Sequence, residues 1–157
     1  MPAPDRAAEL IAGLDLKPHP EGGHYAEVFR SAVRVQTARG ERSALTSIDF
    51  LLGRGEFSAW HRVRSDEVWH LLEGGPLALH LLSPDLSAFE TVVLDRDRRR
   101  HVVAADCWQA AEPRGDLAYV GATVGPGFEF ADFAFGRDDA ALAAALDRLA
   151  PGLRRLL

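Results

Sequence analysis

Two histidines and a carboxylate lie close together between Gly55 and Gly74, a segment patterned as two β-strands joined by a charged turn. Imidazole titrates near neutral pH, and an apolar interior raises the pKa of a carboxyl group. His61 and Glu67 are therefore predicted to be the catalytic residues, acting as a proton-transfer pair. The alternative is that they hydrogen-bond to each other and only orient a ligand. Because strand residues alternate between faces, His70 points away from Glu67 and is assigned to packing or an interface.

Further side chains are candidates for contact with a ligand. Tyr25 and Glu27 share one face of an early strand, together with Phe29, and are predicted to line a pocket. For Glu27 the alternative is an ion pair with a nearby arginine. Trp69 is a candidate for stacking on the ligand, but tryptophans on strands are more often core or interface residues, so a place in the core is favoured.

The loop at residues 18–23 reads Pro-His-Pro-Glu-Gly-Gly and cannot be regular, because its prolines lack donors and its glycines relax the backbone. His19, Glu21 and His24 lie in or beside it. Binding residues concentrate on loops of this kind, so a functional role is one reading and simple turn formation is the other.

The elements that position these residues are mostly short strands. Besides the central pair, strands are expected at residues 25–31, 45–52, 76–82, 89–94, 101–105, 108–111 and 117–124, a spacing typical of a sandwich or barrel. Short helices are expected at each end, the first capped by Asp5 and the second running from Asp138 to Leu149. Four phenylalanines between residues 128 and 135 are expected to plug or flank the barrel.

The composition sets the class of protein. We expect one domain, residues 1–157, since this length closes a single core. The net charge of −5 argues against a nucleic-acid partner. No apolar run approaches the roughly 20 residues of a membrane span, and no signal-peptide pattern begins the chain. Cys107 is the single cysteine, so the expected location is the cytoplasm.

The spacing of Gly55, His61, Val63, Glu67 and Gly74 resembles the first motif of the cupin superfamily, which usually reads Gly, His, His, Glu, Gly. The second cupin motif aligns with residues 104–109. The chain is similar above all to a branch of small, single-domain cupin-like proteins. The matching segments are Pro-His-Pro-Glu-Gly-Gly at 18–23, Trp-His-Arg-Val at 60–63, Ser-Asp-Glu-Val-Trp-His at 65–70, Trp-Gln-Ala-Ala at 108–111 and Gly-Pro-Gly-Phe at 125–128.

This resemblance implies an all-β fold, the cupin double-stranded β-helix or jelly-roll barrel, with a ligand pocket inside and often assembled as a homodimer. The dimer is also favoured by an apolar outer face predicted at Val68 and Leu72. The resemblance places Gln109 at the last position of the cupin metal site, so we expect Gln109 to contact the ligand.

Cupin metal sites commonly use three histidines and one glutamate, whereas this chain offers His61, Val63, Glu67 and Gln109. An aliphatic side chain donates nothing and an amide oxygen is a weak ligand. No cofactor is therefore expected. A divalent transition metal held by His61, Glu67 and Gln109 is the disfavoured alternative.

The sequence predicts a protein that binds a small molecule, a sugar-like or nucleotide-like metabolite, inside the barrel. The alternative is an enzyme, a metal-independent sugar or sugar-nucleotide epimerase or isomerase with His61 as base. A second alternative is a metal-dependent cupin enzyme.

Overall fold

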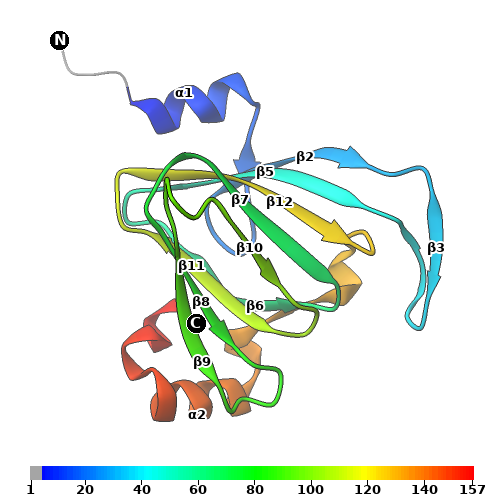
Figure 1. Ribbon diagram of the computed structural model, residues 1–157, viewed down its shortest axis with the longest axis vertical. Coiled ribbons are helices and arrows are strands. Elements are labelled where there is room, and N and C mark those ends of the chain that lie inside the picture. The colour runs from blue at the N-terminus through cyan, green and yellow to red at the C-terminus, as the bar shows by residue number, and fades with distance from the viewer. Residues whose placement is uncertain (1–4) are drawn as a thin grey trace.

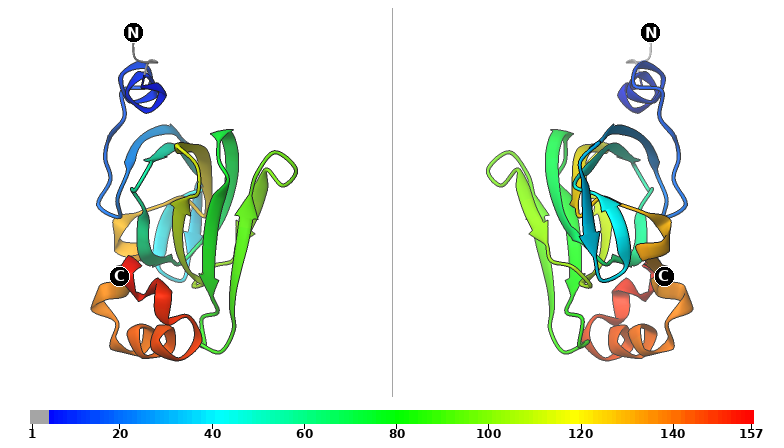
Figure 2. Two further views of the ribbon diagram at one scale, coloured as in Figure 1. Left: turned by 90° about the vertical axis from the view of Figure 1, so that its left-hand side faces the viewer. Right: turned by 90° about the vertical axis from the view of Figure 1, so that its right-hand side faces the viewer.

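The computed structural model describes residues 5–157, so residues 1–4 of the expected 1–157 domain lie outside the described part. Two antiparallel sheets face each other and form a barrel, with short helices outside it (Figure 1; Figure 2). The expected all-β jelly-roll architecture is confirmed. No helix in residues 5–157 is long and apolar enough to cross a membrane.

The first sheet has six strands in the order β1-β2-β5-β12-β7-β10. Their bounds are β1 Lys17–Pro18, β2 His24–Arg30, β5 Thr46–Gly53, β12 Leu117–Gly125, β7 Asp66–Gly74 and β10 Arg100–Val103. The second sheet has five strands in the order β13-β6-β11-β8-β9. Their bounds are β13 Phe133–Phe135, β6 Ser58–Val63, β11 Trp108–Pro113, β8 Leu77–Leu82 and β9 Phe89–Leu94. The seven strands predicted besides the central pair are all present, with ends shifted by a few residues.

The core lies between the two sheets and is built from the inward side of each strand. On β7 the alternation is clean, because Glu67, Trp69 and Leu71 are buried while Val68 and His70 are half-buried on the outer side. They join buried residues of the facing strands, among them Phe50, Leu79, Leu94 and Val120. The predicted separation of Glu67 from His70 is confirmed.

Helices cover parts of both sheets (Figure 1). The first, α1 Arg6–Gly13, is capped by Asp5 as expected and packs Leu10 near β5 and β12. At the other end lie α2 Ala140–Leu149 and three 3-10 turns, η1 Phe130–Asp132, η2 Gly136–Asp138 and η3 Pro151–Leu156. Asp139 caps α2 by accepting from the Leu142 N–H at 2.9 Å. Leu142, Leu146 and Leu156 bury Trp60 and Trp108 on the outside of the five-stranded sheet.

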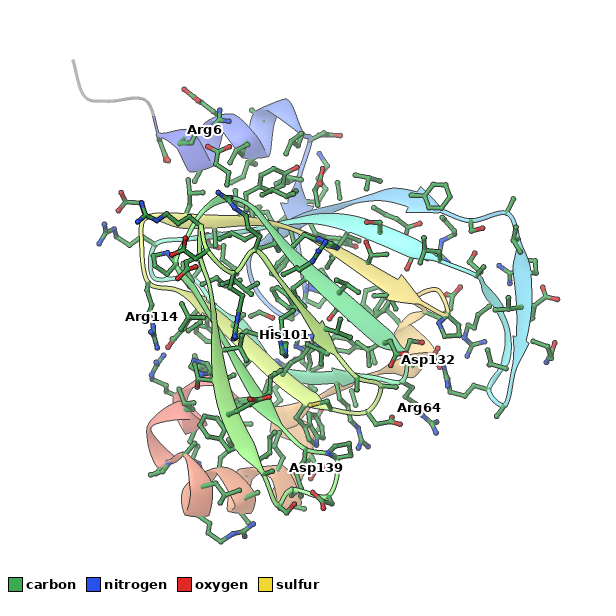
Figure 3. All side chains as sticks on the ribbon, in the orientation of Figure 1. Arg6, Arg64, His101, Arg114, Asp132 and Asp139 are labelled. Carbon is green, nitrogen blue, oxygen red and sulfur yellow. The ribbon has the colours of Figure 1, made fainter. Side chains whose placement is uncertain are left out.

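A two-stranded ribbon that sequence periodicity did not reveal projects from the barrel, β3 Arg34–Thr37 and β4 Gly40–Ser43 (Figure 1). Asp132 of η1, whose side chain is buried, ties the ribbon back to the barrel (Figure 3). Its carboxylate accepts hydrogen bonds from Arg39 Nε at 3.0 Å and from Arg42 Nε at 2.9 Å. This double ion pair fixes the segment beside the barrel mouth.

One parity expectation was wrong, and a β-bulge is the reason. Between β2 and β5, Glu27 pairs with Ile48 but Phe29 pairs with Ser47, so Val28 is an extra residue. Tyr25 and Glu27 face inward as expected, but Phe29 is 52% exposed and Arg30 turns into the barrel mouth instead.

Candidate functional site

A cavity of about 100 Å³ opens between the sheets at the end where β2, β6 and β7 meet the aromatic segment after β12. This volume suits several water molecules or a small ligand. Its lining combines apolar and polar side chains. The apolar lining consists of Ile48, Val63, Ala122, Val124, Phe128, Phe130 and Phe133, and the polar lining of His19, Glu21, Tyr25, Glu27, Arg30, Thr46, His61, Glu67 and Glu129. The expected position of the phenylalanine cluster at the barrel is confirmed.

A buried ion pair lines the cavity, between His61 on β6 and Glu21 in the loop after β1. His61 Nε2 lies 3.0 Å from Glu21 Oε2, and both side chains are more than nine-tenths buried. His61 Nδ1 donates to the Ala59 carbonyl at 2.7 Å. Burial alone lowers the pKa of His61, but the Glu21 charge and hydrogen bond outweigh it and raise the pKa to about 9. His61 is therefore an imidazolium at neutral pH.

The Glu21 carboxylate is the matching anion. Burial raises the pKa of Glu21, but the charge and hydrogen bond of His61 outweigh burial and hold its pKa below the usual value. The loop is fixed by hydrogen bonds from Ala59 N–H to Glu21 O at 2.8 Å and from Glu21 N–H to His19 Nδ1 at 3.0 Å. Gly22 has a φ of +116°, and a Cβ there would collide with the Phe57 carbonyl. The Gly-Gly sequence thus lets the loop lie directly on β6.

His19 stands beside this pair as a neutral imidazole. Burial lowers the pKa of His19, and its Nδ1 accepts the hydrogen bond from Glu21 N–H. The single ring proton is therefore on Nε2, which makes that atom a donor. The ring packs edge-on against Tyr25, with centroids 4.4 Å apart.

Glu67 on β7 is the second buried carboxylate of the cavity. Its Oε1 accepts from Gln109 Nε2 at 2.8 Å and from Trp69 Nε1 at 3.1 Å. Trp69 Nε1 also donates to Gln109 Oε1 at 2.8 Å. Both hydrogen bonds to Glu67 reach Oε1, so Oε2 is left for the cavity. Burial raises the pKa of Glu67, and the charge of Glu21 raises it further against the opposing effect of His61.

Arg30 closes the mouth of the cavity through two carboxylates. Its Nε and Nη2 donate to Glu27 at 2.8 and 3.0 Å, and its Nη1 donates to Glu129 at 3.1 Å. Nη2 also donates to the Phe128 carbonyl at 3.1 Å. The guanidinium thus joins β2 to the aromatic segment across the opening.

The residues predicted from the sequence fall into two groups. His61, Glu67, Tyr25 and Glu27 all line the cavity. Trp69 and Gln109 do not line it; they are 2% and 1% exposed and lie behind Glu67, which they hold by hydrogen bonds.

Neither Arg30 nor Glu129 was predicted to belong to the site, and Glu21 was interpreted as either functional or turn-forming. The signal for Glu21 was a carboxylate next to two glycines in a loop with no regular structure. For Arg30 no sequence signal exists, because the bulge that turns it inward is visible only in the strand register.

The donor set does not fit the metal centre of the cupin pattern. Val63 lines the cavity without a donor atom, and the Gln109 amide is committed to Glu67 and Trp69. The Nε2 of His61 is turned to Glu21 and protonated. Among residues 5–157, no three His, Cys, Asp or Glu side chains are grouped to hold a metal ion.

Comparison with known proteins gives a consistent result. A family model described as "Cupin superfamily (DUF985)" matches residues 8–136. A protein from Shewanella oneidensis is 31% identical, with a TM-score of 0.84 over 96% of each chain. A hypothetical protein from Leishmania major is 30% identical, with a TM-score of 0.80 over 96% of this chain and 95% of that chain.

More distant structures share only the fold. KdgF from a Halomonas species is 14% identical, with a TM-score of 0.53 over 71% of this chain and 87% of that chain. No curated protein matches the sequence. The match over most of the length and the two similar structures at 30% identity or above settle the family. The chain belongs to the DUF985 family of the cupin superfamily.

Proposed function

We propose that this protein binds a small sugar-like metabolite inside the barrel. The observation that carries this proposal is the cavity of about 100 Å³ that holds the buried His61–Glu21 pair and the open Oε2 of Glu67. Ionised groups are costly to bury, and a buried cluster with displaced pKa values at a cavity is typical of a functional site. Carboxylates, imidazoles and aromatic faces together suit the hydroxyl groups and apolar faces of a sugar.

The lining favours a sugar-like over a nucleotide-like ligand. Glu21, Glu27, Glu67 and Glu129 all line the cavity, and two of them already share Arg30. Phosphate groups would meet these like charges in a partly enclosed site, where repulsion is weakly screened. We therefore place free sugars ahead of nucleotides and sugar nucleotides.

A thermal-shift panel of sugars, sugar nucleotides and nucleotides tests this proposal, because a ligand that binds only the native state raises the melting temperature. Val63→Phe fills the cavity and is expected to abolish the shift. Val33→Phe changes a residue that is 64% exposed on the outer surface and is expected to retain it. The absence of any sugar shift in the wild type, or an undiminished shift in Val63→Phe, would contradict binding in the barrel.

A second candidate function is a metal-independent epimerase or isomerase, and the raised pKa values of His61 and Glu67 favour it. A raised pKa makes the Glu67 carboxylate a stronger base and keeps the His61 imidazole protonated as an acid. Because the pKa of His61 is about 9, the structure favours the imidazolium as acid rather than as the base expected from the sequence.

In this scheme Glu67 Oε2 takes the proton from a carbon next to a carbonyl group. The electron pair of the broken C–H bond forms the enediolate, whose oxygen faces the His61 cation. Protonation of the same carbon from the opposite face, by an acid other than Glu67, gives the epimer. Return of the proton from Glu67 to the neighbouring carbon gives the isomer, with His61 giving its proton to the first oxygen and taking the hydroxyl proton of the second.

Incubation of the panel's sugar hits in D₂O separates binding from turnover. Solvent deuterium in the recovered sugar, absent with His61→Ala and with Glu67→Gln, is expected of the enzyme. Binding of a sugar without deuterium uptake would mean that the protein binds the sugar and does not convert it. Product formation that is unchanged in His61→Ala would mean that His61 takes no part in the mechanism.

We propose no resident metal and a cytoplasmic homodimer. Elemental analysis of protein purified without a metal-affinity tag is expected to find less than one metal ion per chain, and stoichiometric metal would contradict this. The dimer proposal rests on the outer side of the six-stranded sheet, where Leu72 is 51% exposed, Val102 is 58% exposed and Val68 is half-buried. Val102 pairs with Val68 across β10 and β7, so these two apolar side chains are neighbours, and Leu72 lies further along the same face of β7.

A further inference from the structure

Negatively charged side chains outnumber positively charged ones in the lining of the cavity. In the described part of the chain, four carboxylates line it, from Glu21, Glu27, Glu67 and Glu129. The cations among the lining residues are Arg30 and His61, because the lowered pKa of His19 keeps that imidazole neutral. The cavity therefore carries an excess of negative charge.

The ion pairs show which carboxylate is left over. His61 is paired with Glu21 at 3.0 Å. Arg30 is paired with Glu27 at 2.8 Å and with Glu129 at 3.1 Å. Within residues 5–157, Glu67 has no Lys, Arg or His nitrogen within ion-pair distance, although its side chain is more than nine-tenths buried. It is the carboxylate without a cation.

The geometry of Glu67 directs its open oxygen into the cavity. Gln109 and Trp69 hold Oε1 from behind, and β7 alternation points the side chain inward. A carboxylate held in this way has a fixed lone-pair direction and needs no rearrangement to accept a donor. A bound cation would also relieve the penalty of burying this charge.

Arg30 does not offer a matching site for an anion. Three of its donor contacts go to carboxylates and a fourth goes to the Phe128 carbonyl. A ligand carboxylate or phosphate would have to displace Glu27 or Glu129 and leave that group unpaired at the mouth. The mouth itself holds two carboxylates for one guanidinium, which favours entry of a cation.

We propose that the cavity selects a ligand bearing a protonated amino group, an amino sugar, over its neutral or acidic counterpart, and that Glu67 Oε2 receives the ammonium. This inference rests on the proposed binding of sugar-like molecules and names their class. An ammonium group needs one carboxylate oxygen and a few further acceptors, whereas a divalent metal needs several donors that this cavity does not group together.

The test is calorimetric titration at pH 7 with glucosamine, glucose and glucuronate. Glucosamine is expected to bind at least about tenfold more tightly than glucose, with glucuronate weakest, because one partly desolvated charge pair is worth about a factor of ten or more. Glu67→Gln is expected to bring the glucosamine and glucose affinities to within about twofold of each other. Glu41→Gln, at an exposed ion pair on β4, is expected to keep the wild-type preference.

The outcomes separate the two proposals. Equal affinity for glucosamine and glucose in the wild type, or an amine preference that survives in Glu67→Gln, overturns the ammonium site but leaves sugar binding intact. Failure of every sugar in the thermal-shift panel overturns the proposed function itself. Zinc or nickel that binds and competes with glucosamine also overturns the inference, because the cation of the cavity would then be a metal.

Discussion

Glu21 Oε2 and His61 Nε2 lie 3.0 Å apart in the interior of the barrel, although the two residues come from a loop and from a strand of the opposite sheet. The pair lies where the cupin pattern leads one to expect a metal centre. Val63 supplies no donor, and Glu21 supplies an internal counter-ion for His61 instead. The chemistry open to the cavity is therefore that of charged hydrogen-bonding groups and proton transfer.

The His61–Glu21 pair predicts how stability depends on pH. The pKa of His61 rises from 6.5 to about 9 on folding, so its contribution is fully present below pH 6.5 and is lost as the pH rises towards 9. The pKa of Glu21 falls below 4.5, so its contribution is lost only in more acidic solution. At 1.36 kcal/mol per pKa unit, the alkaline loss is on the order of 3 kcal/mol.

Urea unfolding at pH 6, 7.5 and 9 measures this dependence. His61→Gln is expected to flatten the loss between pH 6.5 and 9, because no imidazolium remains to titrate. A wild-type free energy of unfolding that stays constant or increases over that interval would contradict a charged pair.

Replacing Glu67 by Gln is expected to stabilise the protein at neutral pH. Burial raises the pKa of Glu67 above 4.5, so the ionised side chain opposes folding increasingly as the pH rises. Glutamine keeps an oxygen acceptor for Gln109 and Trp69 while removing the charge. We expect the unfolding free energy of Glu67→Gln to exceed that of the wild type at pH 7 and to approach it at pH 4, where the carboxyl group is protonated.

Urea unfolding of both proteins at the two pH values measures the difference. Glu41→Gln at an exposed ion pair is the control, expected to change the unfolding free energy by less than about 0.5 kcal/mol. If Glu67→Gln is destabilised equally at both pH values, the ionised carboxyl group of Glu67 does not oppose folding and the prediction is wrong.

Gly22→Ala is expected to disturb the site through the backbone. The φ of +116° and the approach of the Phe57 carbonyl leave no room for a Cβ, so the loop must shift and carry Glu21 away from His61. We expect a loss of about 1–3 kcal/mol of stability and weaker binding of the sugar hits. Gly13→Ala, at a position with nothing near the added atom, is expected to be neutral or stabilising. Urea unfolding and calorimetry compare the two; equal effects would remove Gly22 as the determinant of the loop.

The outer side of β7 and β10 predicts a dimer in solution. Light scattering is expected to give twice the chain mass of 17.1 kDa. Leu72→Lys places a charge in the apolar patch and is expected to shift the mass to that of the monomer. Val33→Lys, at a valine that is 64% exposed on the ribbon side, is expected to leave the dimer intact. A monomeric wild type refutes the assembly.

The strands and both flanking helices could be predicted because their patterns are local. Period-two alternation located β7, Asp5 marked the cap of α1, and the second helix was predicted to begin at Asp138, two residues before α2 starts. The β3–β4 ribbon was not predicted, because its residues are mostly polar and its stability comes from Asp132, about 90 residues away in the chain.

The site could be predicted only where strand parity governs it. His61 and Glu67 follow from alternation on β6 and β7, which are consecutive in the chain but lie in opposite sheets. The partner of His61 could not be derived, since Glu21 reaches it from a loop whose course depends on Gly22 and on backbone contacts with β6. A single inserted residue at Val28 exchanged Phe29 for Arg30 at the mouth, and no periodicity records such a bulge.

The most direct test of the charged, metal-free site is a nitrogen-15 NMR titration of the His61 imidazole in protein purified without a metal-affinity tag. The account predicts that His61 carries both ring protons at pH 7.5 and titrates near pH 9. In Glu21→Gln the pKa is expected to fall below that of the wild type, since burial then acts without the counter-ion. A wild-type His61 that is neutral at pH 7, or whose ring nitrogen is bound to a metal, would contradict the account.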